Sequence, residues 1–443
     1  MTPYHYRLCR YAAAAALFAS ASAVTRGQSP IGEPRAITLA EAVRLAQANS
    51  PTMVVAHNAV RGSAAAVRTS IAQFLPSLSV NVGASRLAGE TFFQGQLIPY
   101  TGDPWSYGKG YGASVMLFSG GQRWLAWRAA RALRDAAEFD EVSRLFSVAQ
   151  TVKLQYFTVL AARESETAGR RQLEQAEHQM ASAMTRLRAG SAVRLDSIRS
   201  AIAVVNARLA ILAAHGALRN ANASLTRLVA SPTLITAVAA DTADMVPIEI
   251  DGVALLSLAE SGPTVRSAQA AAAAYHSSRL AATTSYLPTL SASYGYRASN
   301  TSRAFSCCGG PASSSSGLSF SMSYTLFDGL RRETNVTAAS IAEENADAMF
   351  RDAKFAARDN LTQFLTIYQT ARETIQLQDL NIAAAEEDLS AQQQRYALGA
   401  AVLIEVLNAQ SELASARAAL VTARLQARTA RAQIETLIGR DLK

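Results

Sequence analysis

The sequence is poor in cysteine and histidine, which argues against several kinds of site. Its 443 residues include three cysteines, of which Cys9 lies near the N-terminus while Cys307 and Cys308 are adjacent. Two adjacent cysteines supply neither a disulfide framework nor a zinc site. The five histidines show no ligand spacing and no equivalence between the two halves of the chain. We therefore expect no metal, no cofactor and no catalytic centre, so the chain is not predicted to be an enzyme.

Proline is absent from two long stretches, 105–231 and 312–443. Proline interrupts a helix because its ring clashes with the preceding turn and it lacks a backbone donor. Its absence allows helices at about 120–188 and 329–397, each roughly 100 Å long at 1.5 Å per residue. Both stretches are rich in Arg, Glu, Asp and Gln. We therefore place these helices in an aqueous periplasm rather than in lipid.

A large excess of one charge is also missing. The chain has 42 Lys and Arg against 34 Asp and Glu, a net charge of +8. Its basic residues are spread along the predicted helices instead of gathering with aromatic side chains. This distribution is typical of solvated helix faces, and we expect no nucleic-acid partner.

A long membrane-spanning run is missing from the N-terminus, where a shorter apolar run is present. Arg7 and Arg10 precede an alanine-rich run that ends at Ala21-Ser22-Ala23, a pattern typical of a signal peptide. A first transmembrane helix is the alternative, which the short, serine-broken run disfavours. We assign 1–23 to a signal peptide and 24–36 to an N-terminal linker, so that the mature chain is exported.

The chain carries one design twice, and each copy has a glycine that ends a long helix. After Gly399, apolar residues recur every seven positions, and the stretch after Gly190, 209 residues earlier, follows the same pattern. Such a repeat predicts a coiled-coil seam. The seam positions are Val406, Leu413, Leu420, Ala427, Ile434 and Ala409, Ala416, Ala423, Ala430, Leu437, with Val204, Ile211, Leu218, Leu225 and Ala207, Ala214, Ala221, Leu228 in the first copy. We assign repeats to 37–230 and 251–443, joined by a connector at 231–250.

Each repeat opens with helices that stop at a proline. Thr38 and Glu41 form a capping-box pattern at the first helix start, and Ser119 with Gln122 forms another before the first long helix. Pro76 and Pro288 each follow a leucine and are 212 residues apart. We interpret both prolines as breaks between a helix and a strand.

After each of these prolines the apolar period changes to two, which predicts strands with one apolar and one polar face. The polar positions are Ser77, Ser79, Asn81, Gly83, Ser85 in the first repeat and Thr289, Ser291, Ser293, Gly295, Arg297 in the second. A return strand follows each, before Leu-Phe at 117–118 and at 326–327. The segments 86–110 and 298–316, which holds the run Ser313 to Ser316, are predicted to be loops.

Four strands of about ten residues suit a bilayer but do not close a barrel. An open edge in lipid leaves backbone groups unpaired, at a cost of several kcal/mol each. Several chains would therefore have to share one barrel. Taken alone, the strands fit a small soluble sandwich equally well, and the long helices favour the membrane interpretation.

Together these motifs resemble the TolC-like outer-membrane efflux protein family over about 37–440. The resemblance rests on Leu-Pro before the strands, Leu-Phe-Ser/Asp-Gly after them, and helix tips that read RLRAG and RYALG. It implies a mixed fold of a membrane β-barrel and a long α-helical barrel. The family forms homotrimers with twelve strands in the outer membrane and twelve helices in the periplasm.

The resemblance also implies a function and partners. Members are passive exit ducts of tripartite efflux or secretion systems, with an iris-like periplasmic gate, a periplasmic adaptor and an inner-membrane transporter. By the same resemblance, the helix tips at Arg186, Gly190, Arg395 and Gly399 would dock the adaptor. A periplasmic coiled-coil adaptor or scaffold is the alternative, although it would not need four strands of membrane length.

Two carboxylates lie just beyond the tips, since Asp196 and Glu405 each stand six residues after a tip glycine. In a ring of chains they would converge on a pore entrance and attract cations. The alternative is an ordinary first-turn carboxylate that interacts with the helix dipole. The resemblance implies that Glu405 and Asn408 line the entrance, at positions that are commonly aspartates. It also matches Tyr396 and Arg424 to contacts that lock the gate.

Overall fold

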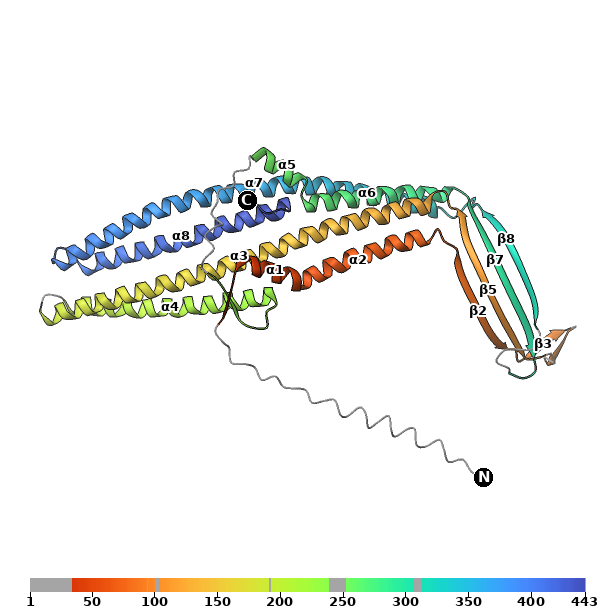
Figure 1. The fold of residues 1–443 in the computed structure, drawn as a ribbon, viewed down its shortest axis with the longest axis horizontal. Coiled ribbons are helices and arrows are strands. Elements are labelled where there is room, and N and C mark those ends of the chain that lie inside the picture. Colours follow the sequence, from red (N-terminus) through yellow and green to blue (C-terminus); the bar gives the residue numbers. More distant parts are fainter. Residues whose placement is uncertain are drawn as a thin grey trace, which may run out of the picture.

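The computed structural model describes residues 34–93, 95–99, 103–190, 193–238, 252–305 and 312–442. The predicted signal peptide, most of the N-terminal linker, and Cys307 and Cys308 lie outside these ranges. The molecule is long, with two helical hairpins at one end and a sheet at the other (Figure 1).

The two halves follow the same order of elements. The first comprises β1 (Arg35–Ile37), α1 (Leu39–Asn49), α2 (Pro51–Ala72), β2 (Ser77–Arg86), β3 (Glu90–Phe93), β4 (Gln96–Pro99), β5 (Trp105–Phe118), α3 (Gln122–Arg188), α4 (Arg194–Val229) and β6 (Ile235–Ala237). The second comprises α5 (Gly252–Glu260), α6 (Pro263–Thr283), the short 3-10 helix η2 (Thr284–Tyr286), β7 (Thr289–Ser302), β8 (Ser313–Ser323), α7 (Arg331–Ala397) and α8 (Leu403–Ile438). Because α3 and α7 both have 67 residues and α4 and α8 both have 36, the predicted duplication is present in the fold.

Prolines stand at the breaks between elements. Pro51 and Pro263 each begin a helix, where the missing backbone donor costs nothing. Pro76 and Pro288 each stand directly before the first residue of a strand. The chain therefore leaves the helical bundle and enters the sheet at equivalent points in both halves.

One predicted helix cap is present and another is wrong. The Thr38 hydroxyl accepts a hydrogen bond from the Glu41 amide (3.3 Å), as the capping-box pattern predicts. Ser119 does not cap α3, because Gly120 and Gly121 have φ values of +61° and +88° and place Gly121 before the first helical residue. The Ser119 hydroxyl instead accepts from Nε of Arg123 (3.4 Å).

The four long strands form one antiparallel sheet in the order β2-β5-β7-β8. β5 and β7 have 14 residues each and are longer than predicted. β8 begins earlier than predicted and ends at Ser323, so that the run Ser313 to Ser316 belongs to a strand rather than to a loop. The predicted loop at 86–110 also contains the β3–β4 hairpin. Serine and glycine look like turn residues locally, but here pairing with Tyr296 to Ser299 on β7 keeps the first residues of β8 extended.

The hairpin seams are buried, most completely between α7 and α8. Every seam position of α8 from Val406 to Ile434 is buried, and Leu437 is partly buried. In α4, Val204, Ala207, Ala221 and Leu225 are buried, while the other four seam positions are half-buried. Each hairpin is thus held by the seven-residue repeat that the sequence displays.

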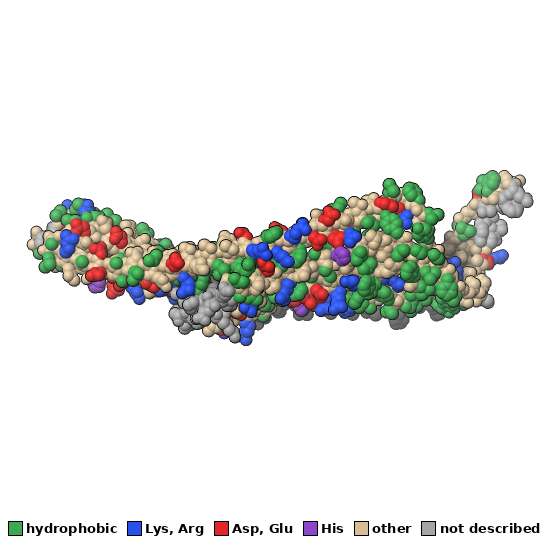
Figure 2. All heavy atoms as spheres, turned by 90° about the horizontal axis from the view of Figure 1, so that it is seen from above, with side chains coloured by type: hydrophobic (Ala, Val, Ile, Leu, Met, Phe, Trp, Pro, Cys, Tyr) green, Lys and Arg blue, Asp and Glu red, His purple; other side chains and the backbone are tan. Residues whose placement is uncertain are grey.

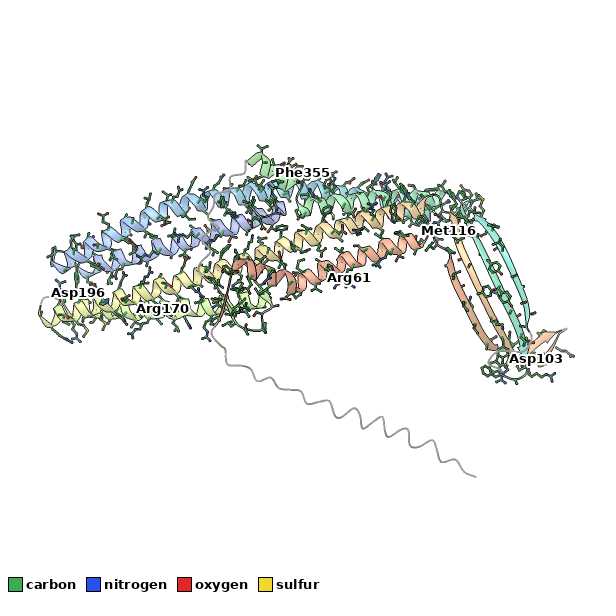
Figure 3. All side chains as sticks on the ribbon, in the orientation of Figure 1. Arg61, Asp103, Met116, Arg170, Asp196 and Phe355 are labelled. Carbon is green, nitrogen blue, oxygen red and sulfur yellow. The ribbon has the colours of Figure 1, made fainter. Side chains whose placement is uncertain are left out.

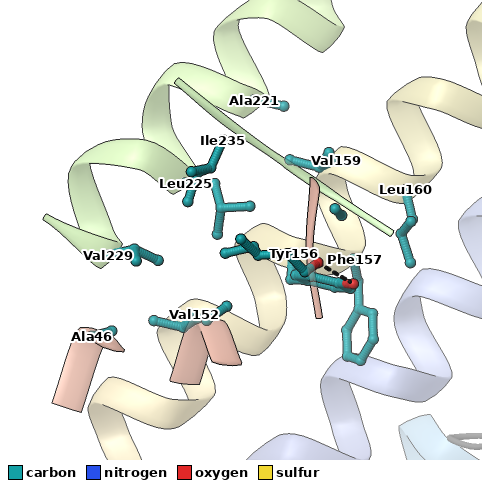
Figure 4. Close-up of a cluster of buried hydrophobic side chains, with 13 residues drawn as sticks. Ala46, Val152, Tyr156, Phe157, Val159, Leu160, Ala221, Leu225, Val229 and Ile235 are labelled. Carbon is teal, nitrogen blue, oxygen red and sulfur yellow. Dashed lines mark hydrogen bonds between the residues drawn. The ribbon is translucent and has the colours of Figure 1, made fainter. Parts of the chain in front are cut away.

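The largest buried cluster among the described residues surrounds Tyr156 of α3 (Figure 4). It includes residues of α1, which lies beside the middle of α3 (Figure 1). The Tyr156 hydroxyl lies 3.1 Å from the carbonyl oxygens of Ile37 and Val238. These two residues are in and next to β1 and β6, which pair in parallel. The linker and connector were predicted without strands, and this pairing corrects that expectation.

Candidate channel-forming surfaces and helix tips

The sheet has one apolar and one polar face, and both are open in a single chain. On the apolar face, Leu78, Val80 and Val82 of β2 are 81%, 78% and 80% exposed. Leu318, Phe320 and Met322 of β8 are exposed in the same way. Contiguous apolar surface of this kind marks contact with lipid or protein rather than water.

The polar face is held together by hydroxyl pairs between strands. Ser77 and Ser114 lie 2.7 Å apart, and the pairs Ser291–Ser321 and Ser293–Ser319 are both at 2.8 Å. A strand with lipid on one side and water on the other needs apolar and polar side chains in alternation along its length. The sheet therefore fits the wall of a membrane barrel.

Aromatic side chains gather at the far end of the sheet from the helices. Trp105 contacts Phe305 with ring centroids 4.9 Å apart, and the Tyr107 hydroxyl donates to the Ala304 carbonyl. Asp103 lies at this far end and Met116 at the helical end (Figure 3). Aromatic belts of this kind are typical of membrane–water interfaces.

The two outer strands of the sheet leave their edges open, because, within the part of the chain that the structure describes, β2 pairs only with β5 and β8 pairs only with β7. The helical part has open edges too. In the hairpin half, α3 contacts both α4 and α8, and α7 packs on α8, so that α4 and α7 are the outer helices there. In the half next to the sheet, α3 and α6 lie between α2 and α7. Charged side chains are spread over the helical part, whereas apolar ones gather toward the sheet end (Figure 2).

Helix α4 carries a second apolar row besides its buried seam. The row repeats every three or four residues and is exposed; its members are Leu195, Ile198, Ile202, Val205, Leu209 and Leu212. By length and hydropathy alone α4 passes the test for a membrane-spanning helix. It is instead one arm of a hairpin, with Asp196 in its first turn and Arg227 in its last. The heptad spacing of this row was readable in the sequence, but the sequence reasoning missed it.

At the tips, the two hairpins of one chain touch through Arg186 and Tyr396. The Arg186 guanidinium donates to the carbonyl oxygens of Tyr396 (2.6 Å) and Ala397 (3.3 Å). It also lies over the Tyr396 ring, 4.6 Å from its centroid. Sequence reasoning placed Arg186 at a docking tip and Tyr396 in the gate, and the structure brings the two together.

The tip glycines adopt left-handed conformations, with φ of +71° at Gly190 and +75° at Gly399. A Cβ at either position would have no described atom within 4 Å, so both glycines face open space. Arg395, one turn before Gly399, donates to Gln392 (3.1 Å) and to the carbonyl of Ala400 (3.4 Å).

The predicted entrance residues lie in the first turns after the tips. Glu405 is half-buried, and one of its carboxylate oxygens lies 4.0 Å from the Arg395 guanidinium. Asp196 is half-buried in the first turn of α4, and Asn408 is exposed on α8. Asp196 lies near the hairpin tips in Figure 3.

Of the two predicted gate residues, only Tyr396 is at the tip. Arg424 lies well along α8, where its guanidinium is 3.8 Å from Asp379 of α7. The structure therefore does not bring Tyr396 and Arg424 together within one chain.

Two histidines make equivalent contacts in the two halves, although the sequence reasoning found no equivalence. His57 of α2 is 3.1 Å from Glu141 of α3, and His276 of α6 is 2.6 Å from Glu343 of α7. By the 212-residue spacing of the prolines, His276 lies seven residues after the position equivalent to His57. By the 209-residue spacing of the tip glycines, Glu343 lies seven residues before the position equivalent to Glu141. A fixed sequence offset cannot detect this one-heptad shift.

The comparisons with known proteins agree with these surfaces. The family model described as outer membrane efflux protein matches residues 42–231 and 255–440. The chain belongs to the outer membrane efflux protein family. It is accordingly a TolC-like channel of the outer membrane with a helical portion in the periplasm.

Two curated relatives of this efflux protein cover most of its length. One is the pyoverdine export outer membrane protein OpmQ of Pseudomonas aeruginosa, 26% identical over 371 residues, which are 82% of this chain and 77% of the relative. The other is protein CyaE of Bordetella pertussis, 25% identical over 394 residues, 86% of this chain and 79% of the relative.

Solved channel structures share its fold. CusC matches with a TM-score of 0.81 and 18% identity over 94% of this chain and 96% of that one. VceC of Vibrio cholerae matches with a TM-score of 0.76 and 17% identity over 91% and 97%. The open state of MtrE of Neisseria gonorrhoeae matches with 0.73 and 17% over 94% of both chains.

Proposed function

We propose that three copies of this chain form one passive export duct that crosses the outer membrane and the periplasm. The observation that carries the proposal is that a single chain leaves its edges open at both levels, at β2 and β8 in the sheet and at α4 and α7 in the helices. A symmetric ring joins the two edges of neighbouring copies. Three copies give a twelve-stranded β-barrel and a twelve-helix α-barrel.

Exposed apolar residues on the two helical edges lie at the same distance from the hairpin tips, which supports this ring. Leu212 lies 18 residues past Arg194, the first residue of α4, and Leu380 lies 17 residues before Ala397, the last residue of α7. Both leucines are exposed, and both stand about 25 Å from the tips at 1.5 Å per residue. In a closed ring, α4 of one copy would bury its apolar row against α7 of the next.

The duct would work in a tripartite system. We propose that residues 1–23 direct export and that 24–36 form a linker before the first repeat. The connector 231–250 would join the repeats 37–230 and 251–443. The hairpin tips would dock a periplasmic adaptor. An inner-membrane transporter would supply the energy. The open space and left-handed backbone at Gly190 and Gly399 support docking there, because a larger residue would strain the turn.

The periplasmic end would be gated by separation of the hairpins. Arg186 holds the two hairpins of one chain together, and opening would break its two hydrogen bonds, to the Tyr396 and Ala397 carbonyls, and its cation–π contact with Tyr396. We propose that adaptor binding favours the open state by replacing these contacts. Arg424 would take part through its neighbour Asp379, away from the tip.

Purified protein in planar bilayers tests the proposal. Native mass spectrometry should give a trimer, and the trimer should conduct with mostly closed periods. Arg186→Ala should lengthen the open periods, whereas Arg188→Ala, an exposed arginine in the same turn, should not. A monomer without conductance would refute the duct, and unchanged gating of Arg186→Ala would refute the latch.

The entrance carboxylates have a separate test. We propose that Glu405 and Asp196 attract cations in the ring, with Asn408 as a neutral neighbour. Glu405→Ala should weaken block by divalent cations added on the periplasmic side and leave assembly intact. Equal block in both proteins would reduce Glu405 to a first-turn carboxylate that stabilises its helix.

A periplasmic adaptor or scaffold is the second candidate function, because the long hairpins would serve it equally well. The exposed apolar face of β2 and β8 favours the duct. Recovery of the mature protein in the soluble periplasmic fraction would favour the scaffold instead.

A further inference from the structure

The polar face of the sheet is lined by very small, uncharged side chains. Cross-strand rows run from β2 through β5 and β7 to β8; they are Ser77-Ser114-Ser293-Ser319, Ser79-Gly112-Gly295-Gly317, Asn81-Gly110-Arg297-Ser315 and Gly83-Gly108-Ser299-Ser313. Within the described parts of these four strands, Arg297 is the single charged residue that shares this face.

The surroundings of Arg297 leave its charge uncompensated. Gly110 and Ser315 stand directly opposite it on the two neighbouring strands. A Cβ at Gly110 would lie 2.7 Å from the carbonyl oxygen of Tyr296, so the close approach of the strands favours glycine there. Across the described residues, no carboxylate lies within ion-pair distance of Arg297, and its side chain is exposed.

The rows on either side of Arg297 also consist mostly of small residues. Glycines fill three of four positions in the row nearer the helices and two of four in the row beyond. Arg297 and the glycines of both rows are among the residues that line an open hollow of about 1020 Å³ on the sheet. Arg297 thus projects from a wall that is otherwise made of hydroxyl groups, one amide and backbone.

We propose that Arg297 makes the exit of the duct selective for anions. The inference rests on the proposed trimer, in which the polar faces enclose the lumen and three copies of Arg297 form a ring. Arg297 is the ninth of fourteen residues of β7, counted from the helical end, so the ring lies in the outer half of the barrel. Rings of arginine side chains are a recognised way to select anions in pores.

Simple geometry sets the size of the effect. Twelve tilted strands about 4.8 Å apart enclose a barrel with a backbone diameter of about 24 Å. An arginine side chain brings its charge roughly halfway to the axis, which leaves a distance close to the Debye length of about 8 Å at physiological salt. Three such charges in a watery lumen should raise the ratio of chloride to potassium permeability about tenfold, because the two ions feel the same potential with opposite sign.

Reversal potentials across a planar bilayer in asymmetric KCl test this proposal. Arg297→Ser should lower the chloride-to-potassium permeability ratio about tenfold relative to the unmodified trimer, and Arg297→Glu should lower it further. The comparison between variants cancels the contribution of the periplasmic entrance, because its carboxylates are the same in every protein.

Lys109 provides a matched control. It is a cation on the neighbouring strand β5, next to Gly110, but its register partners are Val82 and Ala298 on the apolar face. Lys109→Ser should leave the permeability ratio unchanged. A ratio that stays constant in both Arg297 variants, or that falls equally in Lys109→Ser, would overturn the anion filter. Failure of the trimer itself would show differently, as no conductance in any protein.

Discussion

Replacement of Glu435 should loosen the joint between the two halves of the chain. Glu435 of α8 is buried, and one carboxylate oxygen accepts a hydrogen bond from the Lys153 ammonium of α3 at 2.6 Å. The other accepts from the Leu442 amide at 3.1 Å. Breaking a buried ion pair by removing one partner costs about 3–5 kcal/mol, because the remaining charge stays poorly solvated.

The size of this loss predicts a change in melting temperature. Unfolding entropy is about 2.1 cal/mol/K per residue, which for 443 residues gives roughly 1 °C per kcal/mol. Glu435→Gln should therefore melt about 3–5 °C lower, as measured by circular dichroism in detergent. The double variant Lys153→Met/Glu435→Leu should recover part of this loss, because it removes the unpaired ammonium, although Arg431 and the Leu442 amide still lose Glu435 as a partner.

The pH dependence gives an independent check on the same pair. Burial lowers the pKa of Lys153, but its hydrogen bond to Glu435 and the charges of Glu435 and Asp441 outweigh burial and raise the pKa above 10.5. A raised pKa contributes stability that is complete below 10.5 and is lost as the pH rises through the folded value. Glu435→Gln should weaken this alkaline loss. Unchanged melting of Glu435→Gln, or a double variant that loses the sum of the two single losses, would refute the reasoning.

Three further predictions concern the middle core, the ring interface and acid sensitivity. Tyr156→Phe should cost about 1–3 kcal/mol in thermal unfolding, because the Val238 carbonyl loses its hydroxyl donor, while the Ile37 carbonyl keeps the Val238 amide; no loss would mean that water replaces the hydroxyl. Leu209 and Leu212 are 58% and 69% exposed in one chain, so each serine substitution should weaken each trimer interface by about 1–2 kcal/mol, seen as trimer dissociation at lower temperature on a gel. A hydrogen bond from His276 lowers the pKa of Glu343 below 4.5 against the effect of burial, so its stabilisation should be present above 4.5 and lost as the pH falls through the folded value. Glu343→Gln should therefore reduce the fall of the melting temperature at acid pH, and an unchanged fall would contradict that role.

Local sequence patterns determined the elements and their duplication. The absence of proline predicted α3 and α7, and the seven-residue repeat predicted the seam that Val406 and Leu413 occupy. The change to a period of two after Pro76 and Pro288 predicted the strands. These features were readable because each depends on residues within one or two turns, or one strand, of each other.

The tertiary structure decided the contacts between distant segments. Nothing in the linker or the connector indicates that β1 pairs with β6, since three residues carry too little periodicity. Ser313 to Ser316 look like a loop until β7 pairs with them. The His276–Glu343 pair lies one heptad away from the position equivalent to the His57–Glu141 pair, and it forms where α6 packs on α7.

The candidate sites divide in the same way. Motif spacing located the tips at Gly190 and Gly399, because a left-handed turn that reverses a helix needs glycine. Only the fold joined Arg186 to Tyr396, and only the sheet register left Arg297 alone among serines and glycines. The sequence determines which faces of a helix or strand are apolar and which are polar. Packing decides which of those faces meet, because a side chain's partners come mostly from other elements.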